Sequence, residues 1–169
     1  GAFFRRKTVA VIGGGNVAVE DAIFLANLCE KVYVVHRRDE LRADKVLQKT
    51  LLALDNVEMV WNANPVRIEG EARAERLIVK DKFSEEERTL LINGVFIAVG
   101  IKPNAEAFAG AADQDGAGYF VAGEDGVTSV PGIFAAGDIR TKALRQIITA
   151  ASDGANAIRS IQNYLLTIR

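Results

Sequence analysis

The sequence has very little cysteine and very little histidine. Its 169 residues include one cysteine, Cys29, and one histidine, His36. A single cysteine excludes an internal disulfide framework and is typical of a reducing compartment, so we expect a cytoplasmic protein. One Cys and one His do not supply the ligands of a zinc site, and we expect no metal. No nucleophile paired with an acid or base is visible, so no catalytic residue is predicted.

The chain also lacks an excess of either charge and lacks long apolar runs. Its 21 Lys and Arg residues nearly balance its 22 Asp and Glu residues, for a net charge of −1. This balance argues against general binding to nucleic acid or to a membrane surface. No apolar run approaches the roughly 20 residues that a membrane span needs. The apolar share of 49% is sufficient for a core, so any cluster of basic residues needs a local explanation.

The first part of the chain has the pattern of a strand–helix–strand unit. Lys7 to Ile12 is short, apolar and β-branched, which is typical of a buried parallel strand. Apolar residues at near-helical spacing predict a helix from Val17 to Leu28, and Lys31 to Val35 predicts a second strand. The unit takes roughly 30 residues, the usual size of a βαβ unit.

The turn between the first strand and the helix contains Gly13-x-Gly15-x-x-Ala18. Glycines permit a tight turn and a close approach of the backbone to a pyrophosphate, and the small Ala18 permits close helix packing. The phosphates would then lie at the helix N-terminus, on free N–H groups. The pattern is specific because it falls between a strand and a helix. The alternative is a turn that needs glycine only for its own geometry.

A basic cluster follows the second strand. About 20 residues after such glycines, NAD-binding proteins place an Asp or Glu that binds the ribose 2′-hydroxyl. Here the position is occupied by His36, followed by Arg37 and Arg38, with Arg42 expected at the start of the next helix. Guanidinium groups pair with a 2′-phosphate through charge-assisted hydrogen bonds. The cluster predicts NADPH rather than NADH; the alternative is a solvated basic turn.

The pattern after the cluster predicts a three-layer domain over residues 1–103. We expect an α/β, Rossmann-like fold in which a parallel sheet is combined with helices and an antiparallel β-meander. The turn-like Ile101 to Asn104 marks the expected boundary. The further elements expected are a helix over Asp44–Leu54, a strand over Val57–Trp61, meander strands over Pro65–Glu69, Ala74–Asp81 and Arg88–Ile92, and a buried strand over Gly94–Gly100.

Residues 104–169 differ in composition from the first part. They are rich in Gly, Ala and Asp at first, and end in a predicted helix from Ile147 to Leu166. A short strand is expected at Ile133 to Ala136, followed by Gly137 and Asp138. An Asp at a strand end, followed by a loop and a helix, fits a second ligand at the helix N-terminus. A simple cap is the alternative.

Five segments of the sequence together resemble the low-molecular-weight thioredoxin reductases, which are two-domain flavoproteins. They are "VAVIGGGNVAVEDA", "HRRDELRADK", "VFIAVGIKPN", "SVPGIFAAGD" and "RQIITAASDGANAI". The resemblance implies an NADPH-binding domain over residues 1–103 and the C-terminal half of a split FAD-binding domain over residues 104–169. It implies transfer of reducing equivalents from NADPH through FAD to a redox dithiol and then to a thioredoxin disulfide, in a homodimeric parent protein.

The resemblance also implies a role for individual residues of this sequence. It assigns Gly13, Gly14, Gly15, Asn16 and Val17 to the pyrophosphate, Glu20 to the nicotinamide end, and His36, Arg37, Arg38 and Arg42 to the 2′-phosphate. It assigns Ile97 to Gly100, with Val99 and Gly100 foremost, to the cofactor crevice, and Gly137, Asp138, Arg145, Gln146 and Ile147 to FAD.

The sequence departs from the family pattern in two ways. Val17 stands where relatives often have Ser or Thr, so one hydroxyl group is missing. The FAD-binding glycine motif and the Cys-x-x-Cys pair are absent, and Cys29, expected in mid-helix as a small core residue, cannot replace that pair. We therefore interpret the chain as a fragment that is inactive without the other half of the FAD domain. The apolar side chains expected to face that missing half are Phe108, Phe120, Ile133, Phe134, Ile147 and Leu165.

Three alternatives to a thioredoxin reductase stay open on the sequence. A ferredoxin–NADP reductase of the same architecture also has arginines for the 2′-phosphate but no dithiol. Peroxiredoxin reductases of related fold prefer NADH, and the arginine cluster counts against them. A non-catalytic NADPH-binding module is the third alternative.

Overall fold

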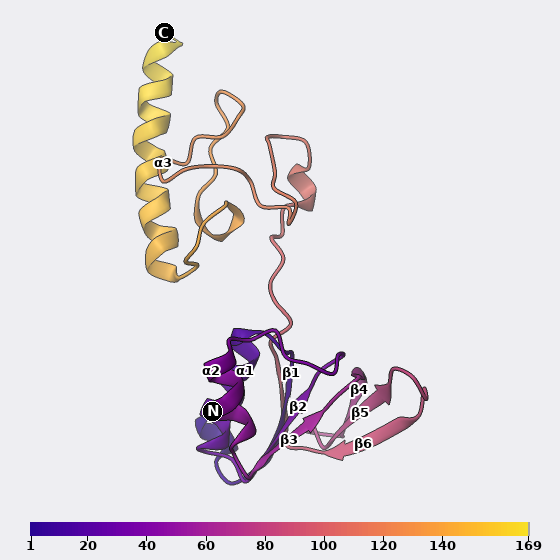
Figure 1. Ribbon diagram of the computed structural model, residues 1–169. Helices are drawn as coiled ribbons and strands as arrows, with labels where there is room; N and C mark the ends of the chain where they lie inside the picture. Colours follow the sequence, from indigo (N-terminus) through magenta and orange to yellow (C-terminus); the bar gives the residue numbers. More distant parts are fainter. Residues whose placement is uncertain (169) are drawn as a thin grey trace. The chain divides into compact units, whose positions relative to one another are not determined.

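The computed structural model describes residues 1–168, which form two compact units. The first unit is Gly1–Gly100 and the second is Ile101–Arg169. This division lies directly before the turn-like segment Ile101–Asn104, whereas the expected domain boundary lay after residue 103. Figure 1 shows a sheet with helices in the first unit, and loops beside one long helix in the second.

The first unit is built on a four-stranded parallel sheet with the strand order β3-β2-β1-β7. Its strands are β1 (Thr8–Ile12), β2 (Lys31–Val35), β3 (Val57–Val60) and β7 (Gly94–Ile97). All three neighbouring pairs are parallel. The predicted βαβ unit is confirmed, and the last strand ends at Ile97 rather than at Gly100.

Helices cover one face of this sheet and an antiparallel meander covers the other (Figure 1). The helices are α1 (Asn16–Ala26) and α2 (Lys45–Leu52). The meander strands are β4 (Ala63–Glu69), β5 (Arg76–Asp81) and β6 (Glu87–Leu91), in the order β4-β5-β6. The predicted three-layer arrangement is therefore present.

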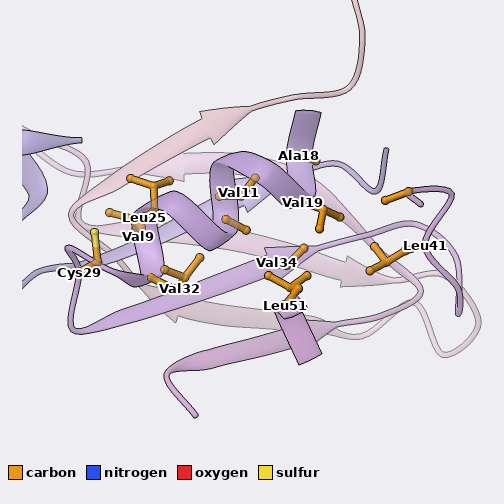
Figure 2. Packing of buried hydrophobic residues seen from close by; sticks show 13 residues of the cluster. Val9, Val11, Ala18, Val19, Leu25, Cys29, Val32, Val34, Leu41 and Leu51 are labelled. Atoms are coloured by element: carbon orange, nitrogen blue, oxygen red, sulfur yellow. The ribbon is translucent and has the colours of Figure 1, made fainter. Parts of the chain in front are cut away.

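The alternation of side chains along β1 explains the two cores of the first unit. Val9 and Val11 belong to the cluster that includes α1 and α2, whereas Ala10 and Ile12 belong to the cluster with the meander. Successive residues of a strand point to opposite faces, so a strand between two layers is apolar throughout. Figure 2 shows the helix-side cluster, in which Val19 and Leu25 of α1 pack near Val32 and Val34.

Two details of the helices differ from expectation. Helix α1 ends at Ala26, so Cys29 lies in the turn before β2 and not in mid-helix; it is buried, with its Sγ 3.2 Å from the carbonyl oxygen of Phe4. Helix α2 begins at Lys45, so Arg42 does not start it. The backbone N–H of Arg42 instead donates to the carbonyl of Gly14 over 2.7 Å, and this bond holds the segment in a loop against the glycine turn.

The second unit has one long helix and little regular structure besides. Helix α3 spans Ile147–Thr167, and 3₁₀ turns occur at Glu106–Phe108 and Gly137–Ile139; a further one, Ala2–Phe4, lies in the first unit. The strand expected at 133–136 was wrong. Phe134 forms only an isolated bridge with Val127, because no strand among the described residues offers a ladder beside it.

The exposed apolar side chains of the second unit match the expectation in part. Phe108, Ile147 and Leu165 are exposed, and Ile147 is 91% accessible. Phe120 was wrongly included, because it is buried in the unit's own small core with Ala105 and Ala135. No helix within residues 1–168 has the length and apolar character needed to cross a membrane.

Candidate functional site

The glycine turn packs closely against its surroundings at two of its three positions. Gly13 has a φ of +150°, and a Cβ there would collide with the carbonyl oxygen of Ala98. A Cβ on Gly14 would collide with the imidazole of His36. These two glycines are therefore required by the fold itself.

Gly15 is different, because a Cβ there would meet nothing within 4 Å. Gly15 is the N-cap of α1, no side chain caps this end, and the first turn contains no acidic residue. The first N–H groups of a helix have no partner within the helix and favour an anion. The space beside Gly15 and the uncapped helix end fit a pyrophosphate, as the glycine pattern predicted.

Asn16 and Asp44 join the beginnings of the two helices. The Asn16 Nδ2 group donates to Asp44 Oδ2 over 2.8 Å, and the Asp44 backbone N–H donates to Asn16 Oδ1 over 2.9 Å. The Asn16 side chain, predicted to bind the pyrophosphate, is thus engaged with Asp44 and positions the loop that contains Arg42.

A cavity of about 410 Å³ lies at the carboxyl ends of the parallel strands, beside the glycine turn. Ligands of open α/β sheets bind at this edge. The cavity brings together seven of the predicted residues and five that were not predicted. The predicted ones are Gly13, Gly14, His36, Arg37, Arg42, Ala98 and Val99, and the others are Ile12, Val35, Ala63, Asn64 and Pro65.

A second cavity, also of about 410 Å³, is lined by Arg37, Arg38, Asn64 and Lys82. It shares Arg37 and Asn64 with the first cavity, so the two are adjacent. Within residues 1–168, neither the arginines Arg37, Arg38 and Arg42 nor Lys82 takes part in an ion pair. The predicted basic cluster is therefore available to an anion. Sequence reasoning missed Asn64 and Lys82, which no local pattern distinguishes from other polar meander residues.

His36 is buried, unlike the arginines that follow it. Its side chain is 4% accessible, and its Nε2 atom has no hydrogen-bond partner. Burial lowers the pKa of His36 below its ordinary value of 6.5, and the positive charges of Arg42, Arg38 and Arg37 lower this pKa further, against an opposing hydrogen bond to the Glu40 backbone. Both effects favour the neutral imidazole where His36 packs against the glycine turn.

The remaining predicted residues of the first unit lie outside these cavities. Val17 and Glu20 are exposed on the first turns of α1, and Gly100 follows β7. Their roles toward the pyrophosphate, the nicotinamide and the crevice stay predictions.

The predicted FAD residues lie in the second unit around the start of α3. Gln146 is the N-cap of this helix, and its backbone N–H donates to Thr149 Oγ1 over 3.1 Å. Arg145 stacks over the Tyr119 ring, with its guanidinium carbon 4.0 Å from the ring centroid. Asp138 and Ile147 are exposed, whereas Gly137 is buried. Their role toward a flavin stays a prediction.

A buried ion cluster in the second unit was not predicted. The Arg140 guanidinium donates to both carboxylate oxygens of Asp153, over 2.8 and 2.7 Å, and Lys142 Nζ lies 2.7 Å from Oδ2. The Gly137 N–H donates to the same carboxylate over 2.9 Å. The hydrogen bond from Arg140 is the main reason that the pKa of Asp153 is held far below its ordinary value. The cluster fixes the 3₁₀ turn at Gly137 against α3.

The described residues 1–168 contain no group of three or more His, Cys, Asp or Glu side chains arranged to hold a metal ion. The candidate site is thus a cavity at the carboxyl edge of the parallel sheet, bordered by glycines and arginines.

Comparison with known proteins agrees with this geometry. Residues 3–154 match the family described as pyridine nucleotide-disulphide oxidoreductase. The chain belongs to this family. The family implies a flavin and a pyridine nucleotide as cofactors.

The chain is similar in sequence to bacterial thioredoxin reductases. It is 39% identical over 169 residues to thioredoxin reductase of Treponema pallidum, and the alignment covers 100% of this chain and 55% of the relative. It is 40% identical over 168 residues to thioredoxin reductase of Listeria monocytogenes, and the alignment covers 98% of this chain and 52% of the relative. The chain thus spans about half the length of these relatives.

Solved structures show the same likeness. A crystal structure of thioredoxin reductase from Streptococcus pyogenes matches with a TM-score of 0.77 and 40% identity, over 98% of this chain and 55% of that chain. A crystal structure of the Lactococcus lactis thioredoxin reductase matches with a TM-score of 0.75 and 35% identity, again over 98% and 55%.

Proposed function

We propose that this chain is part of an NADPH-dependent thioredoxin reductase, with an NADPH-binding domain over residues 1–103 and part of an FAD-binding domain over residues 104–169. The observation that supports NADPH most directly is the group of three arginines at the carboxyl end of β2. Arg37, Arg38 and Arg42 border the cavities beside the glycine turn and are free of ion pairs within residues 1–168. A carboxylate, which would favour NADH, is absent from the position directly after β2.

The residues of the first unit have separate tasks in this proposal. The first N–H groups of α1 bind the pyrophosphate, because Gly15 leaves space for it. The guanidinium groups of Arg37, Arg38 and Arg42 bind the 2′-phosphate. When bound, the nicotinamide cofactor supplies a hydride to the flavin, which passes the electrons to a dithiol. The residues of this chain bind and orient, and none of them is proposed to react.

The second unit contributes residues to the flavin in the same proposal. Asp138 is proposed to accept a hydrogen bond from the ribityl chain, and Arg145, Gln146 and Ile147 to lie along the flavin. Gly137 is held in place for this by its hydrogen bond to Asp153. The name of the relatives supports thioredoxin as the protein substrate. The homodimeric assembly of the parent protein and its cytoplasmic location stay predictions.

A calorimetric titration of this chain with NADPH and with NADH tests the nucleotide preference. We expect NADPH to bind about tenfold or more tightly than NADH, because a phosphate makes charge-assisted hydrogen bonds with arginines. The Arg37→Ala/Arg38→Ala double variant should lose this preference while keeping the wild-type circular dichroism spectrum. Equal affinities in the wild-type chain, or an unchanged preference in the double variant, would contradict the proposal.

The same purified chain tests the expectation that it does not hold FAD by itself. We expect no flavin absorbance in the chain as purified and no disulfide reductase activity with NADPH. Flavin that stays bound through gel filtration would show that this expectation is wrong.

A further inference from the structure

The second cavity is lined by residues from two separate parts of the chain. Arg37 and Arg38 follow β2, whereas Asn64 lies on β4 and Lys82 lies in the turn between β5 and β6. All four lining residues are cationic or amide-bearing, and none is acidic. The β-meander thus contributes directly to the basic cavity, in addition to covering the sheet.

Backbone hydrogen bonds fix this arrangement. The Asn62 N–H donates to the Arg38 carbonyl over 3.2 Å, and the Lys82 N–H donates to the Asn62 carbonyl over 2.7 Å. The Ala63 N–H also donates to the His36 carbonyl over 3.1 Å. The main chain at Arg38 is therefore linked to the main chain at Lys82 through a single residue. The backbone positions from which these side chains extend are therefore fixed relative to one another before an anion binds.

Two acidic residues at the β5–β6 turn, Asp81 and Glu85, have other partners than Lys82. The Asp81 carboxylate accepts hydrogen bonds from the backbone N–H groups of Phe83 and Ser84, over 2.8 and 2.9 Å. The Glu85 carboxylate lies 3.1 Å from Lys80 Nζ. Lys82 takes part in no ion pair within residues 1–168; its Nζ lies 5.6 Å from the ring centroid of Phe83. Its charge is thus not neutralised within the turn.

We propose that Lys82, assisted by Asn64, is a further determinant of specificity for the 2′-phosphate of NADPH. This inference rests on the proposed NADPH-binding function of the same site. Lys82 contributes a point charge from the meander side, opposite the planar guanidinium groups of Arg37 and Arg38. The Asn64 amide contributes a neutral donor between them. A phosphate dianion has enough acceptor oxygens to bind both sides of the cavity at once.

The test compares four forms of the chain by calorimetry: wild type, Lys82→Met, Asn64→Ala and Lys49→Met. Lys49 is exposed on α2 and lines neither of the two cavities, so its variant loses the same charge elsewhere. Each form is titrated separately with four ligands: NADPH and adenosine 2′,5′-bisphosphate, which have the 2′-phosphate, and NADH and 5′-AMP, which lack it. The Arg37→Ala/Arg38→Ala variant is measured in parallel.

We expect Lys82→Met to weaken binding of NADPH and of the bisphosphate by about three- to tenfold, the range for one charged contact near the surface. Affinity for NADH and 5′-AMP should stay within about twofold of wild type, and Asn64→Ala should show a smaller loss of the same kind. Lys49→Met should behave as wild type. Since Lys82 is exposed, its variant should fold normally, as circular dichroism will verify.

Three results would overturn the inference, and they are distinguishable from one another. If wild type prefers NADPH, the arginine variant loses this preference and Lys82→Met keeps it, the role of Lys82 is refuted and the NADPH proposal stands. If wild type does not distinguish NADPH from NADH, both are refuted together. An equal loss in Lys82→Met and Lys49→Met would also refute the role of Lys82, because it would reflect net charge alone.

Discussion

The imidazole of His36 lies directly against the backbone of Gly14, so that a Cβ on Gly14 would overlap the ring atoms Cε1, Nδ1 and Nε2. His36, the residue that follows β2, therefore packs against the glycine turn. Arg37 and Arg38 instead line the adjacent cavities. The resemblance assigned His36 to the 2′-phosphate together with the arginines. The burial of His36 indicates that its ring also packs against the glycine turn.

Alanine substitutions at two neighbouring glycines should separate an effect on stability from an effect on NADPH binding. Gly14→Ala forces the new methyl group into the His36 ring, and we expect it to lower the free energy of unfolding by about 1–3 kcal/mol. Gly15→Ala places its methyl group in open space at a φ of −93°, so it should cost about 1 kcal/mol or less. It should nevertheless weaken NADPH binding, because the methyl group occupies the space beside the helix end.

Urea unfolding and NADPH calorimetry on both variants measure these effects. Wild-type stability in Gly14→Ala would show that the turn moves away from His36 freely. Wild-type NADPH affinity in Gly15→Ala would show that the pyrophosphate does not lie beside Gly15.

The buried His36 should make the first unit less stable in mild acid. Its pKa in the folded chain is lowered from the ordinary value of 6.5, so the unfolded chain binds more protons as the pH falls below about 6.5. The contribution of His36 is therefore fully present above pH 6.5 and is lost as the pH falls. His36 is the only histidine, so its NMR titration is unambiguous, and its midpoint should lie below 6.5.

A His36→Asn variant is the control for this pH effect, because asparagine does not titrate in this range. The difference in free energy of unfolding between wild type and this variant should change between pH 7.5 and pH 5. A pH-independent difference, or an NMR midpoint above 6.5, would contradict the prediction.

Removing the charge of Asp153 should strongly destabilise the second unit. The Asp153 carboxylate is 2% accessible and accepts hydrogen bonds from Arg140, Lys142 and Gly137. Asp153→Asn removes the anion of Lys142 and leaves Arg140 with the exposed Glu124 as its remaining ion-pair partner within residues 1–168. Loss of one partner of a buried ion pair costs about 3–5 kcal/mol. Asp113→Asn is the matched control, since Asp113 is exposed and takes part in no ion pair within residues 1–168. Chemical denaturation, followed by the helical circular dichroism signal, measures the free energy of unfolding of the two variants. Equal free energies of unfolding for Asp153→Asn and Asp113→Asn would contradict the prediction.

The same carboxylate predicts a loss of stability in strong acid. Its pKa in the folded chain is lowered below the ordinary value of 3.8. The stabilisation is therefore present above pH 3.8 and is lost as the pH falls through the lower, folded value. Wild type should lose more stability than Asp153→Asn between pH 5 and pH 2. Parallel acid unfolding curves for the two would argue against this role.

The single thiol should react slowly. Burial raises the pKa of Cys29 above its ordinary value of 9.0, which lowers the thiolate fraction at neutral pH, and the Sγ atom lies against the Phe4 carbonyl. We expect a thiol reagent such as DTNB to label native chain at least about tenfold more slowly than chain unfolded in urea. Equal rates would show that the turn before β2 opens readily.

Local patterns in the sequence predicted most elements of the first unit and the core of its site. Period-two and period-3.6 spacing located β1, α1, β2 and the meander, because these elements bury one or two continuous apolar faces. The strand at 133–136 was predicted wrongly by the same reasoning, since a short apolar run becomes a strand only where a neighbouring strand is available to pair with it. The helix ends were displaced for a related reason: Arg42 is held in a loop by its bond to Gly14, a contact distant in sequence.

The sequence by itself determined the glycine turn and the arginines after β2, because each depends on residue type and short spacing. Only the tertiary structure decided that His36 is buried beneath Gly14, that Asp153 is enclosed by Arg140 and Lys142, and that Lys82 borders the same cavity as Arg37. In the first unit, the pairing of β1 with β2 and the backbone bonds of Asn62 to Arg38 and Lys82 bring these segments together. In the second unit, Arg140 and Asp153 meet because the 3₁₀ turn at Gly137 packs against α3. The burial and charge that define the chemistry of these residues arise only from such tertiary contacts.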